Sequence, residues 1–107
     1  MKLNIKLAYG LDASKESPQR TSLNVLEMFV NSAHKDGVDG HYRRMWGRIQ
    51  RKFEEAVEKN QESVELDGSE VDLLKNAIRE GKIPTIYAKF SVILEDEIEK
   101  LTNEEKK

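Results

Sequence analysis

The stretch from 41 to 57 has the clearest pattern of hydrophobic and polar positions in the chain. At about 100° per residue its apolar side chains share one helical stripe roughly 120° wide, namely Tyr42, Met45, Trp46, Ile49, Phe53, Ala56 and Val57. The basic side chains Arg44, Arg48 and Arg51 point the other way, with Arg43 and Lys52 on the flanks. The pattern predicts an amphipathic helix over about 41–60, with its tryptophan in the core and its arginines in solvent.

Three other segments have the apolar spacing of helices. Residues 22–35 place several apolar side chains on one face before Gly37, although Leu23-Asn24-Val25 would also suit an extended chain. Asp67 and Glu70 match an acidic version of the capping box and predict a short helix that ends at Gly81. The last helix is predicted to open at Ile83-Pro84, since proline suits a first turn, and to run to about 103.

Two segments have the pattern of strands. Residues 2–9 alternate apolar and polar side chains, which is typical of a strand with one buried face. Residues 63–66 are the obvious partner, although the first strand is also a candidate for pairing across a subunit boundary. Residues 10–21 are polar and contain glycine and proline, which predicts a flexible connection, and 34–41 form a second loop.

These elements predict a mainly helical single domain over 1–107, with three or four helices and a minor β component. The short N-terminal strand would pair with 63–66 and lie on the helices, because a two-stranded ribbon alone is marginal. Residues 104–107 should fray. The expected core consists of ten apolar side chains, namely Phe29, Val30, Met45, Trp46, Ile49, Phe53, Leu74, Ile78, Phe90 and Leu94.

Composition narrows the class of protein. The chain has 107 residues, 37% hydrophobic and 36% charged, which suits one modest core with a well-solvated surface. Its net charge of −2 predicts no broad attraction to nucleic acid or membranes. The absence of cysteine excludes disulfides and thiolate chemistry. With no apolar signal core and no stretch near ~20 apolar residues, we expect a cytoplasmic protein with no membrane partner.

The basic cluster is the first candidate site. Residues 41–52 hold five lysines or arginines and no acid, whereas 53–72 hold eight acids and one lysine. The simplest interpretation is a solvated face with local pairs of Arg51 with Glu55 and of Glu55 with Lys59. Segregated charge also suits docking onto an acidic protein partner. A nucleic-acid interface is less favoured, because the aromatic side chains of this helix point away from its arginines.

The loop at 34–41 is the second candidate, because it holds His34, Asp36, Asp39 and His41 among glycines. Imidazole and carboxylate groups both suit zinc or iron. The spacing matches no metal motif, and it lacks the alternating oxygen donors of a calcium loop. Aspartate and glycine are also ordinary turn residues, so a plain connection is favoured and a metal-binding loop is an alternative.

Four further positions, two of them taken together, each allow two interpretations. Glu97 lies at the rim of the last helix's apolar stripe, where a carboxylate without a partner is expected to reach solvent rather than act as an acid or base. Val92 and Ala88 project opposite that stripe, so the helix is either central in the bundle, which we favour, or carries an interface. Gly47 indicates either a closely packed neighbour or a site that tolerates the loss of helix propensity.

No phosphate-loop, zinc-protease or serine-hydrolase motif occurs, so we expect neither an enzyme nor a cofactor. The leading hypothesis is a non-catalytic accessory or adaptor protein that docks to a protein partner or to itself as a homo-oligomer. Its candidate contact residues are Arg43, Arg44, Arg48, Arg51 and Lys52, with Val92 and Ala88 as a candidate interface. The alternatives are a nucleic-acid-binding regulator using the arginines and a metal loop at 34–41. Small, charge-rich helical chains without catalytic motifs are common among phage and mobile-element accessory proteins, which is an association and not a derivation from these residues.

Overall fold

The computed structural model describes residues 1–7 and 17–105. Its elements are, in order, β1 (Lys2–Asn4), α1 (Pro18–Ala33), α2 (Gly40–Glu58), β2 (Ser63–Glu65), α3 (Gly68–Glu80), the 3-10 turn η1 (Thr85–Tyr87) and α4 (Ala88–Glu105). The predicted fold class, a mainly helical domain with a small sheet, is confirmed. Among the described residues, no helix is long and apolar enough to cross a bilayer.

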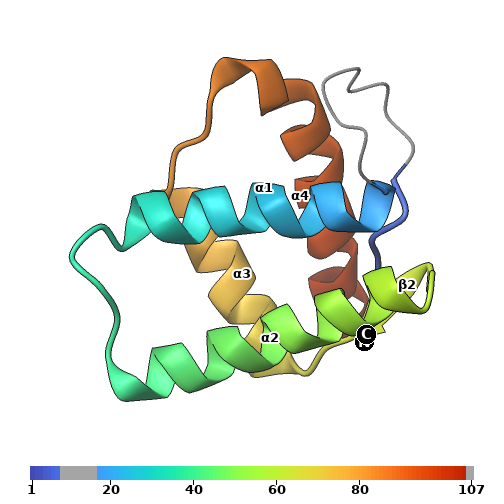
Figure 1. The fold of residues 1–107 in the computed structure, drawn as a ribbon, viewed down its shortest axis with the longest axis horizontal. Helices are drawn as coiled ribbons and strands as arrows, with labels where there is room; N and C mark the ends of the chain where they lie inside the picture. The colour runs from blue at the N-terminus through green and yellow to red at the C-terminus, as the bar shows by residue number, and fades with distance from the viewer. Residues whose placement is uncertain (8–16, 106–107) are drawn as a thin grey trace.

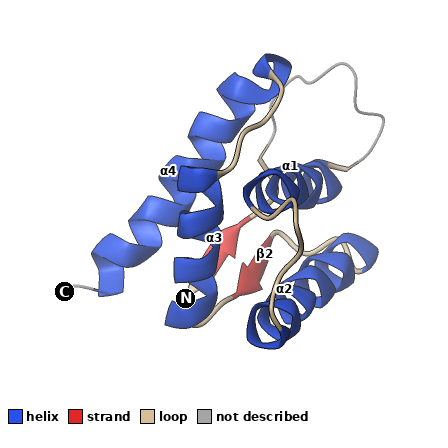
Figure 2. Ribbon diagram, turned by 90° about the vertical axis from the view of Figure 1, so that its left-hand side faces the viewer, coloured by secondary structure: helices blue, strands red, loops and turns tan. Residues whose placement is uncertain are grey.

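The two strands form an antiparallel sheet in which Leu3 lies opposite Val64, so the predicted pairing is confirmed within one chain. Figure 2 shows the strands between the helices, with β1 packed against α4 and β2 against α2. In Figure 1, α1 and α2 run as neighbours joined at one end, and α3 crosses and contacts both. Because β1 has its partner inside the chain, it no longer argues for pairing between subunits.

Helix α1 begins at Pro18, four residues before the predicted start at Ser22. The hydroxyl of Ser17 accepts a hydrogen bond from the N–H of Arg20, and Pro18 occupies the first turn, where an N–H is not needed. This helix-start signal is hidden in a stretch whose polar composition predicts a connection. The remainder of that predicted connection, 10–16, lies outside the described residues.

Two other predicted boundaries differ in the structure. β1 ends at Asn4 rather than at residue 9, because β2 offers only three residues for pairing, and residues 8 and 9 lie outside the described ranges. The last helix begins at Ala88 rather than at Pro84. Pro84 has an extended backbone and precedes the single turn η1, so it stands before the helix instead of inside its first turn.

Eight of the ten predicted core side chains are buried, and Trp46 and Ile78 lie partly buried at the edge of the core. The indole of Trp46 therefore packs inward without being enclosed. A polar contact holds the start of α1 beside the turn before β2. There the Nε2 of buried Gln19 donates to the carbonyl of Gln61 at 2.9 Å and to Oδ1 of Asn60 at 3.1 Å.

The two predicted ends of α3 are confirmed. Asp67 and Glu70 form the capping box, with each side chain accepting from the other residue's N–H. Gly81 ends the helix where the chain passes close to α1. A Cβ at Gly81 would lie 2.3 Å from the carbonyl oxygen of Phe29, so only glycine fits there without a shift of the backbone.

Candidate functional site: the arginine face of α2

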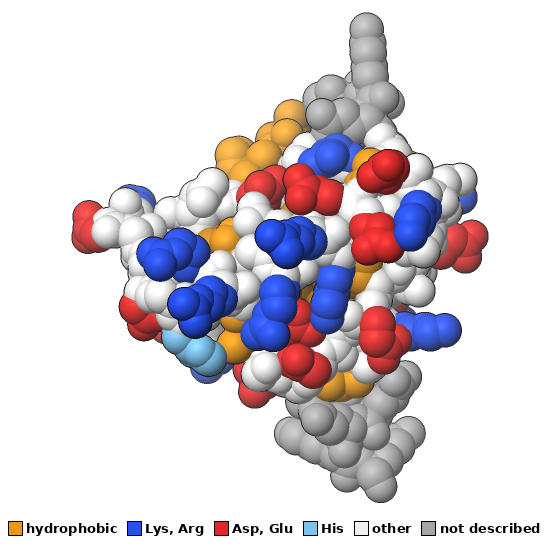
Figure 3. All heavy atoms as spheres, turned by 60° about the horizontal axis from the view of Figure 1, so that its bottom comes forward, with side chains coloured by type: hydrophobic (Ala, Val, Ile, Leu, Met, Phe, Trp, Pro, Cys, Tyr) orange, Lys and Arg blue, Asp and Glu red, His pale blue; other side chains and the backbone are white. Residues whose placement is uncertain are grey.

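Four exposed arginines lie along one side of α2, namely Arg43, Arg44, Arg48 and Arg51. Together with His41 they form a surface that we call the arginine face. Asp39 fixes the start of this helix, because its side chain accepts from the N–H of Tyr42 at 2.9 Å. Arg44, Arg48 and Arg51 follow one another at steps of four and three residues, which keeps them on one side over about two turns, and Arg43 lies on their flank. Figure 3 shows basic side chains gathered on the side of the molecule that α2 covers, with acidic side chains around them.

The arginine face is hollowed at Gly47. The hollow is open to solvent and is lined by this glycine and by the five side chains of the face. A Cβ added at Gly47 would meet no atom within 4 Å, so no neighbouring element packs closely against it. The structure therefore excludes close packing as the reason for this glycine. An interior helical glycine costs about 1 kcal/mol relative to alanine, and the fold gains no contact in return.

Among the residues that the structure describes, none of the four arginines has a carboxylate within 4.0 Å. The predicted pair of Arg51 with Glu55 is therefore wrong. Glu55 instead pairs with Lys59 at 2.7 Å, as predicted for those two, and this hydrogen bond lowers the pKa of the Glu55 carboxyl. Because Glu55 turns toward the end of the helix, Arg51 is left facing solvent.

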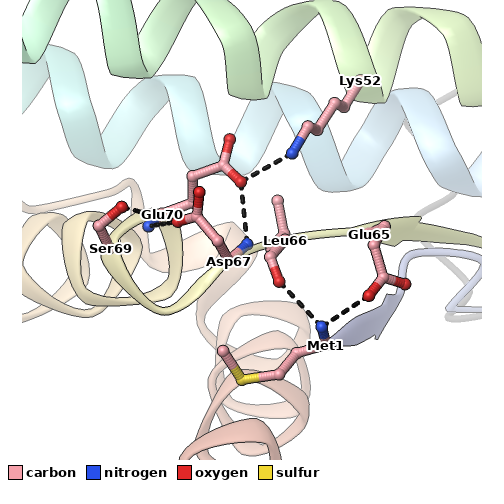
Figure 4. A network of polar contacts seen from close by, with 7 residues as sticks. All are labelled: Met1, Lys52, Glu65, Leu66, Asp67, Ser69 and Glu70. Carbon is pink, nitrogen blue, oxygen red and sulfur yellow. Dashed lines mark hydrogen bonds and ion pairs between the residues drawn. The ribbon is translucent and has the colours of Figure 1, made fainter.

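Lys52 does not belong to the arginine face, contrary to the sequence-based assignment. Its Nζ lies 2.7 Å from Oε1 of Glu70, whose side chain is 2% exposed. The same oxygen of Glu70 accepts from the N–H of Asp67 at 2.9 Å, so Lys52 completes the capping box of α3 (Figure 4). In the same network the amino group of Met1 donates to Glu65 at 2.7 Å and to the carbonyl of Leu66 at 2.9 Å. Lys52 thus stabilises the fold.

Between its caps, α2 carries arginines toward its N-terminus and acids toward its C-terminus, an order that the helix dipole does not favour, whereas the caps Asp39 and Lys59 have the favourable signs. The first turn contains no acid and the last turn contains no base. Exposed acids, Glu54, Glu55 and Glu58, follow the arginines toward the C-terminus of the helix. A helix is stabilised by acids near its N-terminus and by bases near its C-terminus, by about 0.3–1 kcal/mol for each such charge. The arrangement is therefore not one that the stability of α2 alone would favour.

The aromatic side chains of α2 lie away from the arginine face. Trp46 packs against the core edge, and the ring of Tyr42 lies 4.4 Å from that of His34. The hydroxyl of Tyr42 is buried and has no hydrogen-bond partner among the described residues. Burial, with a smaller contribution from the charge of Glu80, raises the pKa of this phenol. Among the described residues, no phenylalanine, tyrosine or tryptophan ring is therefore offered to a base beside the arginines.

The loop at 34–41 does not assemble its four candidate ligands. The ring of His34 contacts that of Tyr42 at a tilt of 55°, Asp39 caps α2, and His41 lines the hollow of the arginine face. Within the described ranges, no three His, Cys, Asp or Glu side chains are arranged to hold a metal ion. The sequence pattern assigns His41 to a candidate metal-binding loop. Its position three residues before Arg44 already indicates that it lies on the arginine face.

The expectation that the last helix lies at the centre of the bundle is wrong. Val92 is 55% exposed and Ala88 is also exposed, so the helix is not central in the bundle. Ile86, in the turn before it, is 65% exposed and was not singled out from the sequence. Glu97 lies at the rim as expected, where it pairs with Lys100 at 3.1 Å.

Comparisons with protein-family models, with curated proteins and with solved structures found no match to this chain.

Proposed function

We propose that this protein is a non-catalytic docking module that binds an anionic segment of another protein through the arginine face of α2. The observation that carries the proposal is the set of four exposed arginines without carboxylate partners in the described structure, around an open hollow. Guanidinium groups bind carboxylates and phosphates through paired hydrogen bonds, which favours a specific anionic partner.

The intramolecular energetics favour a ligand for these arginines. Arg44 and Arg48 are four residues apart, and like charges at this spacing destabilise a helix by about 0.2–0.5 kcal/mol. The chain has 20 acidic residues against 18 basic ones, so carboxylates for pairing are plentiful. An anionic partner would relieve this repulsion.

A protein partner fits better than a polynucleotide. A nucleic-acid backbone presents phosphates continuously, and the acids that follow the arginines on α2 would repel it. Base stacking also favours large aromatic rings on the basic surface, where the described residues provide only the imidazole of His41. A protein partner can place its own basic residues opposite Glu54, Glu55 and Glu58, so both halves of the helix would contribute to recognition.

Affinity capture with charge-matched variants tests the proposal. The Arg44→Glu/Arg48→Glu variant reverses two charges on the arginine face, and Lys35→Glu/Lys89→Glu makes the same change at exposed positions elsewhere. We expect a protein that is retained by the parent and by the control, is lost with the arginine variant, and survives nuclease treatment. Retention that nuclease abolishes, together with salt-sensitive binding of an oligonucleotide, would assign the face to nucleic acid instead.

Self-association through α4 is a second candidate, because Ile86 and Val92 are large apolar side chains exposed on neighbouring turns. Sedimentation over a hundredfold range of concentration tests it. A dimer that Val92→Lys dissociates, with helix content unchanged, supports this candidate. A monomer at the highest concentration rejects it.

A further inference from the structure

The hollow at Gly47 identifies the kind of anion that the docking module takes. Resting on the proposed function, we infer that this hollow binds the phosphate group of a phosphorylated side chain on the partner protein. The group would sit over Gly47, with the guanidinium groups of Arg44, Arg48 and Arg51 around it.

Gly47 is the first reason. Glycine is unfavourable in the interior of a helix, and here the fold does not need it, since the space that a side chain would occupy is empty. Glycine is used where a ligand must approach the backbone closely. At this position the surrounding side chains are all cationic or imidazole groups, so the group admitted is an anion.

The concentration of charge is the second reason. Four guanidinium groups line one hollow rather than an extended track, and each offers its donors in a planar fork. A phosphate monoester carries about −1.5 to −2 charge and three acceptor oxygens, which matches several guanidinium groups at once. A single carboxylate carries one charge and has two acceptor oxygens, so it would leave donors of the hollow unused.

The acids of α2 favour a phosphorylated protein over a nucleic acid. A phosphodiester carries one charge and is followed by further phosphates, which would meet Glu55 and Glu58 along the same helix. A phosphorylated side chain is a single dianion, and the residues beside it in a protein can be basic. The arginines and acids of α2 together therefore suit a phosphorylated segment with a lysine or arginine nearby.

Binding of defined probes tests the inference. The probes are inorganic phosphate, a short phosphoserine peptide with lysines on one side, the same peptide with serine or glutamate, and a single-stranded oligonucleotide. In the full chain, we expect NMR signals of Gly47 and the neighbouring arginine side chains to shift with phosphate. We expect the phosphoserine peptide to bind about ten- to a hundredfold tighter than its glutamate form, which corresponds to the gain expected from charge-assisted hydrogen bonds.

Substitution of Gly47 provides the decisive variants. Gly47→Met is expected to raise the melting temperature, because methionine is a good helix former and has room there, and to weaken phosphopeptide binding about tenfold or more by filling the hollow. Gly47→Ala, which adds one methyl group, should raise the melting temperature and weaken binding less. Binding that is lost from a more stable protein cannot be attributed to unfolding.

Two results would overturn the inference. One is a Gly47→Met protein that binds the phosphoserine peptide as tightly as the parent. The other is an oligonucleotide or glutamate peptide that binds as tightly as the phosphopeptide. Either result leaves the proposed function intact if Arg44→Glu/Arg48→Glu still abolishes capture of the partner, so the two failures are distinguishable.

Discussion

Nζ of Lys52, on α2, lies 2.7 Å from Oε1 of Glu70, on α3, and the carboxylate of Glu70 is almost completely buried. The same carboxylate caps α3 through the N–H of Asp67, so one side chain joins a helix start to a neighbouring helix. An acid buried in this way needs its charged partner, because an unpaired buried charge is costly. The relationship explains why one of the five basic residues of α2 is not available to a partner.

Removal of Lys52 is therefore expected to destabilise the fold. Lys52→Met should lower the free energy of unfolding by about 1–3 kcal/mol, since it leaves the buried Glu70 carboxylate without its cation. The matched control is Lys59→Met, whose pair with Glu55 is exposed on both sides and should affect stability much less. Urea denaturation measures both. Equal effects of the two variants would contradict the structural role of Lys52.

The two helix-related glycines are expected to respond in opposite directions to alanine. Gly47→Ala should raise the free energy of unfolding by about 1 kcal/mol, because the added methyl meets open space in a helix interior. Gly81→Ala should lower it, since the new Cβ would stand 2.3 Å from the carbonyl oxygen of Phe29. Urea denaturation of the two variants beside the parent measures the difference. A destabilising Gly47→Ala would mean that a contact of Gly47 supports the fold.

Reversing a charge on the arginine face should not harm the fold. Arg48→Glu removes the repulsion with Arg44 and places an acid three residues before Arg51, which favours the helix by a few tenths of a kcal/mol. We expect the free energy of unfolding to stay equal or rise at low salt, with the gain shrinking as salt increases. Denaturation at two ionic strengths checks this. A clear loss of stability would show that Arg48 has an internal partner.

The buried hydroxyl of Tyr42 is expected to affect the stability of the fold and its dependence on pH. Tyr42→Phe removes an oxygen that is buried without a partner among the described residues, so we expect stability at neutral pH to stay equal or rise by about 1 kcal/mol. Burial raises the pKa of the phenol above its ordinary value of 10.0. The unfolded chain therefore ionises first, and stability should fall as the pH rises from about 10 through the folded pKa.

Urea denaturation between pH 8 and pH 11 tests the pH dependence of Tyr42. The parent should lose stability more steeply than Tyr42→Phe over that range, and absorbance titration should show one phenol ionising later than the others. Identical pH profiles of the two proteins would contradict the burial of this hydroxyl.

The sequence alone determined the helices and most of their faces. Apolar residues at helical spacing place Ile49 and Phe53 inside and Arg44 and Arg48 outside, because this division depends only on the geometry of one helix. The capping box at Asp67 was readable for the same reason, since all its atoms come from four consecutive residues. The start of α1 was also readable at Ser17 and Pro18, but the polar composition around them favoured a connection.

Only the tertiary structure decided what each exposed or flanking residue does. Lys52 could be assigned to Glu70 only once α2 and α3 were packed together, because the two residues are 18 positions apart. The packing of α4 on one side alone left Val92 in solvent. Likewise, nothing in the local sequence of Gly47 tells whether a neighbour covers it. Periodicity fixes the direction of a side chain on its own helix, whereas contacts depend on which elements the whole fold brings together.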